Sequence, residues 1–298
     1  MPVGPDGWRG WQGAAIDFAL TVSMRDTETL FYHLRGTEKA APYHAPKAEW
    51  EHHSAAEKKV LKIAFLTESP VGTPVSTEAI KATHNAAKFL EQQGHEVIEI
   101  PYPVNGRQLI DSYYLMNGAE TAAMFDGIQQ AIQRPVTKAD MESMTWGIYQ
   151  YGLQIPASQY TRSLQLWDQT AYKMEQLFEE YDVLLTPSTA DIAPKIDAEL
   201  QSDQIRKDLR QAESLSILQL KDLIYDMFEK SLTISPFTQL ANLTGQPAIS
   251  LPTHIAESGL PLGIQFMASK GREDLLFQVG KLFEREQKFL LPNYYRES

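Results

Sequence analysis

The stretch KIAFLTESPVGTPVSTEAIKATHNAAKFLEQQGHEVIEI (residues 62–100) decides the fold. It opens on a short, nearly continuous apolar run at 62–66, which is typical of a strand covered on both faces. A helical pattern follows, and HEVIEI (95–100) indicates a second strand. A strand, a helix and a strand within about 40 residues form a βαβ unit, whose strands should be parallel and whose crossover should be right-handed. We therefore expect an α/β fold.

The helix of this unit carries its own start and stop signals. Ser76 or Thr77 can accept the first backbone N–H bonds, and Gly94 suits the left-handed turn that ends a helix. The residues expected on its buried side are Ile80, Ala87 and Leu90.

Upstream of this unit, residues 1–50 are predicted to be a loop-rich entry with one helix. Residues 1–20 are crowded with Gly, Pro and Trp, which is loop composition. Ser23, with Asp26 three residues later, indicates a capped helix that runs to about Leu34. Two prolines and scattered polar residues make 35–50 a connector.

Downstream, the pattern is mainly helical over 106–232, interrupted by a buried strand at 181–187 that Pro187 ends. Residues 195–232 should form a long helical region whose last part has the stronger apolar stripe. The chain closes with strands at 248–252 and 262–268 and a helix over 273–287.

We expect one domain over 1–298, with a βαβ unit at 60–105 and closing strands and helix at 236–290. The expected fold class is α/β, with one mixed β-sheet covered by helices.

The composition excludes several function classes. Hydrophobic residues make up 43% and charged residues 22% of the 298 residues, which is typical of a globular protein. The net charge of −11 and the lack of a Lys/Arg cluster argue against binding to nucleic acid or to an anionic membrane. Cysteine is absent, which excludes disulfides and thiolate chemistry. No apolar run approaches the roughly 20 residues of a membrane span, so we expect a cytoplasmic protein.

Motifs for metal, phosphate or serine-hydrolase chemistry are not found. There is no G-x-S-x-G elbow, no P-loop and no G-x-G-x-x-G. His95 and Glu96 begin like a zinc-protease motif, but Glu99 stands where the second histidine should be. His52 and His53 are best interpreted as a solvated surface pair. We expect no metal and no cofactor.

Four segments, read together, resemble one family. They are WQGAAIDFALTVSMRDT (11–27), APYHAP (41–46), YDVLLTPSTADIAP (181–194) and PFTQLANLTGQPAISLP (236–252), the last continued by GLPLGIQFMASKGREDLL (259–276). In order and spacing they resemble the second part of an amidase signature enzyme. The first two segments look most like the branch that contains the nylon cyclic-dimer hydrolases. The resemblance implies an amidase-signature-like fold, truncated at its N-terminus.

Members of this family hydrolyse carboxamides with a Ser–Ser–Lys triad. The lysine takes a proton through a bridging serine, the second serine attacks the amide carbonyl, and backbone N–H groups hold the oxyanion. The resemblance places all three residues in a Gly/Ser-rich stretch and upstream of it, and this chain begins just past that stretch. It contains no Gly-Gly and no Ser-Ser dipeptide. No catalytic residue is therefore assigned, and we expect the chain to be inactive alone.

The resemblance also implies that part of a substrate pocket remains. Residues expected by position to line the acyl side or the cleft floor are Asn117, Thr121, Phe125, Trp146, Pro236 and Phe237. The alternative for each is core packing, because aromatic and small residues at helical spacing usually belong to the core.

The expected partners are a small-molecule amide substrate and a second polypeptide. The latter is a second copy, giving a homodimer, or an N-terminal amidase segment, because a missing half would leave apolar faces and a strand edge exposed. Two other functions stay open: a non-catalytic binding or scaffold module, and a component like the A subunit of a tRNA-dependent amidotransferase.

Overall fold

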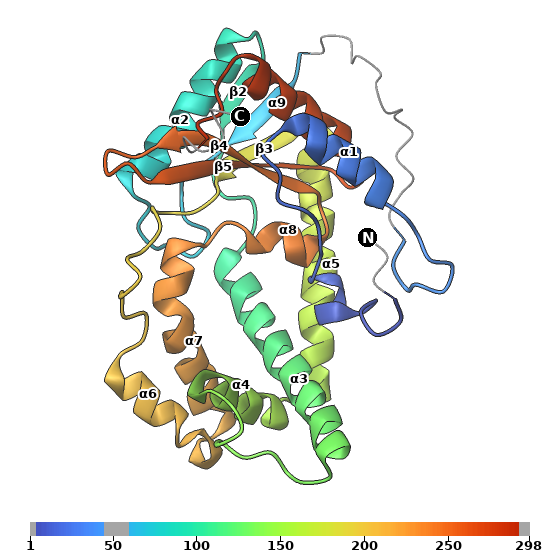
Figure 1. Cartoon of the computed structure of the whole chain (residues 1–298), viewed down its shortest axis with the longest axis vertical. Coiled ribbons are helices and arrows are strands. Elements are labelled where there is room, and N and C mark those ends of the chain that lie inside the picture. The colour runs from blue at the N-terminus through green and yellow to red at the C-terminus, as the bar shows by residue number, and fades with distance from the viewer. Residues whose placement is uncertain (1–3, 45–59, 292–298) are drawn as a thin grey trace. The chain divides into compact units, whose positions relative to one another are not determined.

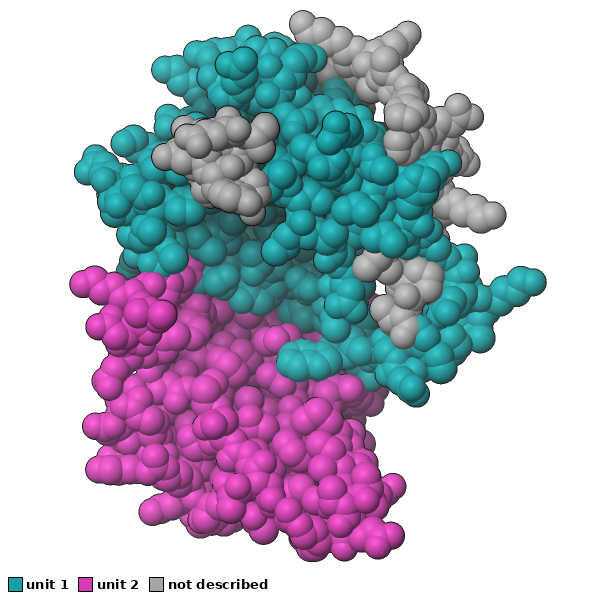
Figure 2. Space-filling view, in the orientation of Figure 1, with its two compact units in different colours: residues 1–104, 170–193, 235–298 teal, residues 105–169, 194–234 magenta. Residues whose placement is uncertain are grey.

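A computed structural model describes residues 4–44 and 60–291. The chain divides into two compact units. Unit 1 comprises residues 1–104, 170–193 and 235–298, and unit 2 comprises residues 105–169 and 194–234 (Figure 2). The boundary at residue 169 falls inside one long helix, α5 (Ala157–Glu180).

Unit 1 is built on one five-stranded sheet of order β2-β1-β3-β5-β4 (Figure 1). Its strands are β1 (Lys62–Phe65), β2 (Glu96–Glu99), β3 (Val183–Pro187), β4 (Ala248–Ile255) and β5 (Pro261–Ala268). Strand β1 pairs in parallel with β2 and with β3, whereas β5 runs antiparallel to both β3 and β4. The five strands expected from the sequence thus share one mixed sheet, and the parallel pairing of the βαβ unit is confirmed.

The crossover helix of the βαβ unit, α2 (Thr77–Gln92), begins where its cap predicted. The hydroxyl of Ser76 accepts the backbone N–H of Ala79 at 3.2 Å, and Gly94 adopts φ +88° just beyond the helix. Of the three residues expected on its buried side, Ala87 and Leu90 are buried and Ile80 is half-buried. Most residues of the buried side are small, and the full set is Ala79, Ala82, Thr83, Ala86, Ala87, Phe89 and Leu90. Small side chains let the helix axis approach the sheet closely.

One face of the sheet carries the hydrophobic core of unit 1. Helices α2 and α9 (Glu273–Arg285) supply side chains to a cluster that includes Ile63, Leu185 and Phe266 from the strands. Helix α1 (Met24–Leu34) adds Met24, which packs so closely on α9 that a Cβ built at Gly280 would lie 2.5 Å from its sulfur. Ser23 caps α1 by accepting the N–H of Asp26, as expected.

The remaining elements of unit 1 are short. They are η1 (Gly10–Gly13) and α8 (Gln239–Thr244), the latter ended by Gly245 at φ +78°. Strand β4 extends three residues beyond its expected end at Pro252 and changes register between Leu251 and His254. The ring of His254 lies 2.7 Å from the carboxylate of Glu78, a contact that ties the far end of β4 to the first turn of α2.

Unit 2 is helical. Besides the first part of α5, it contains α3 (Gly106–Ile132), α4 (Ser143–Gln154), α6 (Asp203–Leu209), η2 (Ala212–Ser214) and α7 (Ile217–Ile234). The long helical region expected over 195–232 is therefore broken into three pieces and begins only at Asp203. Helices α3 and α4 meet through glycines, because a Cβ at Gly152 would lie 1.9 Å from the carbonyl oxygen of Gly118. No helix in the described part of the chain is long and apolar enough to cross a membrane.

Candidate functional site

A row of polar side chains crosses three strands on the sheet face opposite the core cluster. Thr186 on β3 pairs in register with Gln265 on β5, which in turn pairs with Ser250 on β4. Because side chains alternate along a strand, these three share one face. Thr186 and Gln265 are buried, and the side-chain amide of Gln265 donates to the Thr186 hydroxyl at 3.4 Å. Burying a polar side chain without a hydrogen bond costs free energy, so a buried polar row of this kind is a candidate for a functional site.

The row ends in a pair of serines. The hydroxyls of Ser188, just past β3, and Ser250 lie 2.6 Å apart, and either can donate. Their approach depends on Gly263, because a Cβ there would lie 2.9 Å from the Ser250 hydroxyl and 3.1 Å from that of Ser188. The N–H of Ser188 also donates to the carbonyl of Gly263 at 3.1 Å. The end of β3 thus meets strands β4 and β5, and 62 positions separate Ser188 from Ser250 in the sequence.

The serine pair lacks the base that nucleophilic catalysis requires. A serine hydroxyl is a weak nucleophile unless a neighbouring group accepts its proton. Within residues 4–44 and 60–291, neither Ser188 nor Ser250 hydrogen-bonds to a lysine, a histidine or a carboxylate. The pair can orient a polar group by hydrogen bonding, but its surroundings do not activate it for attack on a carbonyl.

Four of the six residues expected to line a pocket lie in unit 2, and each has a neighbour within that unit. Asn117 is buried, and its side-chain oxygen accepts the hydroxyl of Thr121 at 3.2 Å. Phe125 and Trp146 are also buried, and the ring of Tyr149 lies 5.3 Å from the first and 5.8 Å from the second. Asn117 and Thr121 thus contact each other, and Phe125 and Trp146 both pack against Tyr149. Their burial fits core packing as well as a pocket wall, so the pocket assignment stays a prediction.

The other two expected residues, Pro236 and Phe237, lie in unit 1 directly before α8. Both are buried, and Phe237 is only 2% exposed. Their role in a cleft likewise stays a prediction.

Trp146 takes part in a charged cluster of unit 2. Its indole N–H donates to Glu213 at 2.9 Å, and the Lys138 ammonium lies 2.6 Å from the other oxygen of the same carboxylate. Together, the hydrogen bonds from Lys138 and Trp146 lower the pKa of Glu213 to about 2. A carboxylate held ionised in this way anchors the connection between α3 and α4 to η2, and it has no proton to give near neutral pH.

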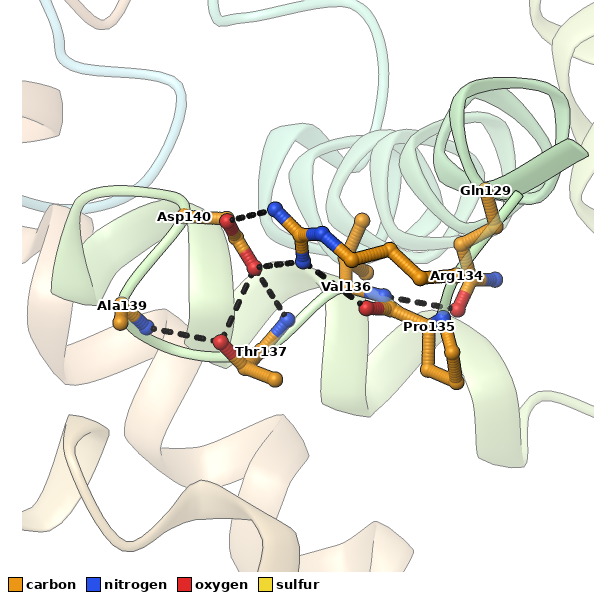
Figure 3. A network of polar contacts seen from close by, with 7 residues as sticks. All are labelled: Gln129, Arg134, Pro135, Val136, Thr137, Ala139 and Asp140. Atoms are coloured by element: carbon orange, nitrogen blue, oxygen red, sulfur yellow. Dashed lines mark hydrogen bonds and ion pairs between the residues drawn. The ribbon is translucent and has the colours of Figure 1, made fainter. Parts of the chain in front are cut away.

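A second network closes the turn between α3 and α4 (Figure 3). The guanidinium of Arg134 meets both carboxylate oxygens of Asp140, at 2.9 and 2.7 Å, and Thr137 donates to the same group through its N–H and its hydroxyl. These donors hold the pKa of Asp140 well below its usual value. All of these contacts lie within seven residues of the chain. The network therefore stabilises the turn, and we do not assign it as a functional site.

The described residues form no cluster of metal ligands, and His95 has a structural contact instead. No group of three or more His, Asp or Glu side chains within the described ranges could hold a metal ion. The ring of His95 accepts the N–H of Leu61 at 3.0 Å and thereby joins the starts of β1 and β2. His52 and His53 lie outside the described residues.

Sequence reasoning missed the serine pair. Ser188 and Ser250 are 62 positions apart and belong to no local motif. The available signal was weak, because Ser250 is a polar residue inside the expected strand 248–252 but Ser188 only follows the expected strand 181–187.

A family model called Amidase matches residues 19–277. The chain belongs to the amidase family. The lipoamidase of Enterococcus faecalis is 36% identical over 283 residues, covering 95% of this chain and 37% of that protein. The 6-aminohexanoate-cyclic-dimer hydrolase of Paenarthrobacter ureafaciens is 27% identical over 277 residues, covering 91% of this chain and 54% of that protein.

Solved structures agree with this assignment. The structure of 6-aminohexanoate cyclic dimer hydrolase complexed with substrate matches this amidase chain with a TM-score of 0.71 and 28% identity, over 87% of this chain and 52% of that one. The α/β fold expected from the resemblance is thereby confirmed. The chain spans about half the length, or less, of these relatives.

Proposed function

We propose that the chain takes part in hydrolysing a carbon–nitrogen bond of a carboxamide by the Ser–Ser–Lys mechanism, with the triad supplied by residues other than these 298. The match of the amidase family over residues 19–277 carries the proposal. The sequence contains no Ser-Ser or Gly-Gly dipeptide, and the one serine pair of the sheet has no lysine bonded to it in the described part of the chain. We therefore infer that the chain alone does not hydrolyse amides.

In this proposal the chain supplies scaffold and part of a pocket. Asn117, Thr121, Phe125 and Trp146 would contact the acyl part of a small amide, and Pro236 and Phe237 would lie near the floor of the cleft. The required partner is an N-terminal amidase segment that carries the nucleophile, and a second copy of the chain is the other expected partner. No cofactor is needed, because lysine, serine and backbone N–H groups supply the base, the nucleophile and the oxyanion site.

The experiment compares the chain alone with the chain after addition of a complementing segment. The segment is the N-terminal part of the 6-aminohexanoate-cyclic-dimer hydrolase that this chain does not match. Substrates are the 6-aminohexanoate cyclic dimer and small aliphatic and aryl amides, and the readout is amine or ammonia release. We expect no turnover by the chain alone and measurable turnover by the mixture.

Two controls make the result decisive. The same segment with its nucleophilic serine replaced by alanine should give no turnover with the chain. Ser188→Ala and Ser250→Ala in the chain should leave turnover by the mixture within about twofold. Turnover by the chain alone that survives repurification, labels a serine with a phosphonate and disappears in Ser188→Ala would place the nucleophile on this chain and refute the proposal. A mixture that binds amide without turnover would favour a binding module.

A further inference from the structure

Helix α3 carries the dipeptide Asn-Gly in two different settings. Asn105 and Gly106 lie at its start, whereas Asn117 and Gly118 lie in its interior. Asparagine is a thermolabile residue, because the backbone nitrogen of the next residue can attack its side-chain carbonyl carbon. Glycine in the next position favours this attack, since it has no Cβ to hinder the approach. The two dipeptides share the same chemistry, so the fold decides which of them can react.

The first dipeptide is open to the attack. Asn105 is exposed, and its backbone, at φ −80° and ψ 92°, lies outside the helical conformation. The N–H of Gly106 is one of the first in the helix, which have no intrahelical partner, and no residue of the described ranges accepts it. The side-chain oxygen of Asn105 accepts the N–H of Gln108 at 2.9 Å. A donor at this oxygen stabilises the negative charge that develops there during attack.

The second dipeptide is shielded by its packing. Asn117 is only 7% exposed, and its side-chain oxygen accepts the hydroxyl of Thr121 at 3.2 Å. A Cβ built at Gly118 would lie 2.9 Å from the ring of Tyr151, so the space beside this backbone is filled. In the interior of an α-helix each N–H donates to the carbonyl four residues before it. Attack at Asn117 therefore requires α3 to open locally.

We propose that Asn105 is a site of spontaneous deamidation and that Asn117 is not. The nitrogen of Gly106 loses its proton and bonds to the side-chain carbonyl carbon of Asn105. The bond from this carbon to the side-chain nitrogen breaks, and ammonia leaves. Water then opens the resulting succinimide at either carbonyl, which gives aspartate or isoaspartate. The net reaction consumes one water, releases ammonium and adds one negative charge to the chain.

The two products act on α3 in opposite ways. Aspartate keeps an acceptor for the N–H of Gln108 and places a negative charge at the helix N-terminus, where it is stabilising. Isoaspartate routes the backbone through the former side chain and so removes the capping group. Asn105 is the first residue of unit 2, so the product determines how firmly the first helix of that unit begins. Neither Asn105 nor Gly106 belongs to the proposed pocket, so failure of this proposal would leave that of amide hydrolysis untouched.

Ageing of the full chain at mildly alkaline pH tests the proposal, with one sample folded and one in urea. Peptide mapping by mass spectrometry measures each site, and electron-based fragmentation distinguishes isoaspartate from aspartate. In the folded chain we expect Asn105 to react at least about tenfold faster than Asn117, because only locally opened molecules expose Asn117. In urea the two rates should agree within about threefold, because the fold no longer separates the sites.

Two variants identify the product. Asn105→Ser keeps a capping acceptor but has no amide to lose. The acidic form that accumulates in the aged wild type should therefore be missing from this variant on ion exchange. Asn105→Asp should elute with the aspartate product and should have a urea midpoint at or above that of the wild type. The separated isoaspartate form should have a lower midpoint, because it lacks the cap.

Three results would overturn the proposal. Equal rates at Asn105 and Asn117 in the folded chain would show that α3 does not protect its interior dipeptide. Reaction at Asn105 in urea but not in the folded chain would show that the cap prevents the attack. Acidic forms that accumulate equally in Asn105→Ser and in the wild type would place the modification elsewhere.

Discussion

At the scale of the residue, Gly152 controls how closely two helices of unit 2 approach. A Cβ at this position would lie 1.9 Å from the carbonyl oxygen and 2.6 Å from the carbonyl carbon of Gly118, and backbone atoms cannot move aside as a side chain can. We expect Gly152→Ala to lower the free energy of unfolding by roughly 1–3 kcal/mol, because α3 and α4 must separate. Urea denaturation followed by circular dichroism measures the change.

Gly127 provides the matched control, because it lies in α3 with no atom within 4 Å of an added Cβ. Gly127→Ala should raise the free energy of unfolding by about 0.5–1 kcal/mol through the better helix propensity of alanine. Equal effects of the two substitutions would show that the glycine contact between α3 and α4 is not close.

Glu213 gives unit 2 a defined pH response. Its pKa is lowered from 4.5 to about 2, chiefly by the hydrogen bond from Lys138. A carboxyl whose pKa is lower in the folded state stabilises the fold above its unfolded pKa, and this contribution is lost as the pH falls from about 4.5 towards 2. Glu213→Gln should therefore be less stable than the wild type at pH 6, and the difference should shrink by pH 3.

Urea midpoints of both proteins across this pH range measure the effect, which is modest because the carboxylate and the ammonium are both partly exposed. Glu179→Gln serves as the control, since Glu179 is an exposed carboxylate outside this cluster. A difference between wild type and Glu213→Gln that stays constant from pH 6 to pH 3 would contradict the assigned ion pair.

At the scale of the element, the start of α2 depends on one hydroxyl. Ser76 accepts the N–H of Ala79, and its own N–H donates to the carbonyl of Ala190 at 2.8 Å. Ser76→Ala removes only the first bond and should lower the free energy of unfolding by about 1 kcal/mol. Ser76→Asp keeps an acceptor at the same place and should restore most of the loss. Equal destabilisation of both variants would contradict the cap, because the backbone bond to Ala190 is present in both.

At the scale of the whole molecule, the two compact units each have their own buried interior. We expect the units to differ in local stability. Gly280→Ala, which crowds Met24 in unit 1, should accelerate amide exchange mainly in α1 and α9, and Gly152→Ala should do so mainly in α3 and α4. Hydrogen exchange with mass spectrometry resolves the two sets of peptides. Equal acceleration of both sets by either variant would mean that the chain unfolds as one unit.

Local pattern predicted much of unit 1 and little of the candidate site. Caps such as Ser23 and Ser76, and the turn glycine Gly94, act through bonds to residues within a few positions, so they can be read from the sequence. The breaks in the helical region expected over 195–232 were missed, although Ser202, whose hydroxyl accepts the N–H of Ile205, marks the position where α6 begins. The serine pair was missed because its members meet only once β3, β5 and β4 are in register.

The sequence by itself determined the βαβ unit, the mixed sheet, the acidic character and the membership of the amidase family. Those properties depend on periodicity, on composition and on the order of segments, all of which are present in the unfolded chain. Only the tertiary structure decided how closely Gly118 and Gly152 approach and that Ser188 and Ser250 share a hydrogen bond. These depend on side-chain volume and strand register between residues far apart in the chain, where a shift of one residue reverses which side chains meet.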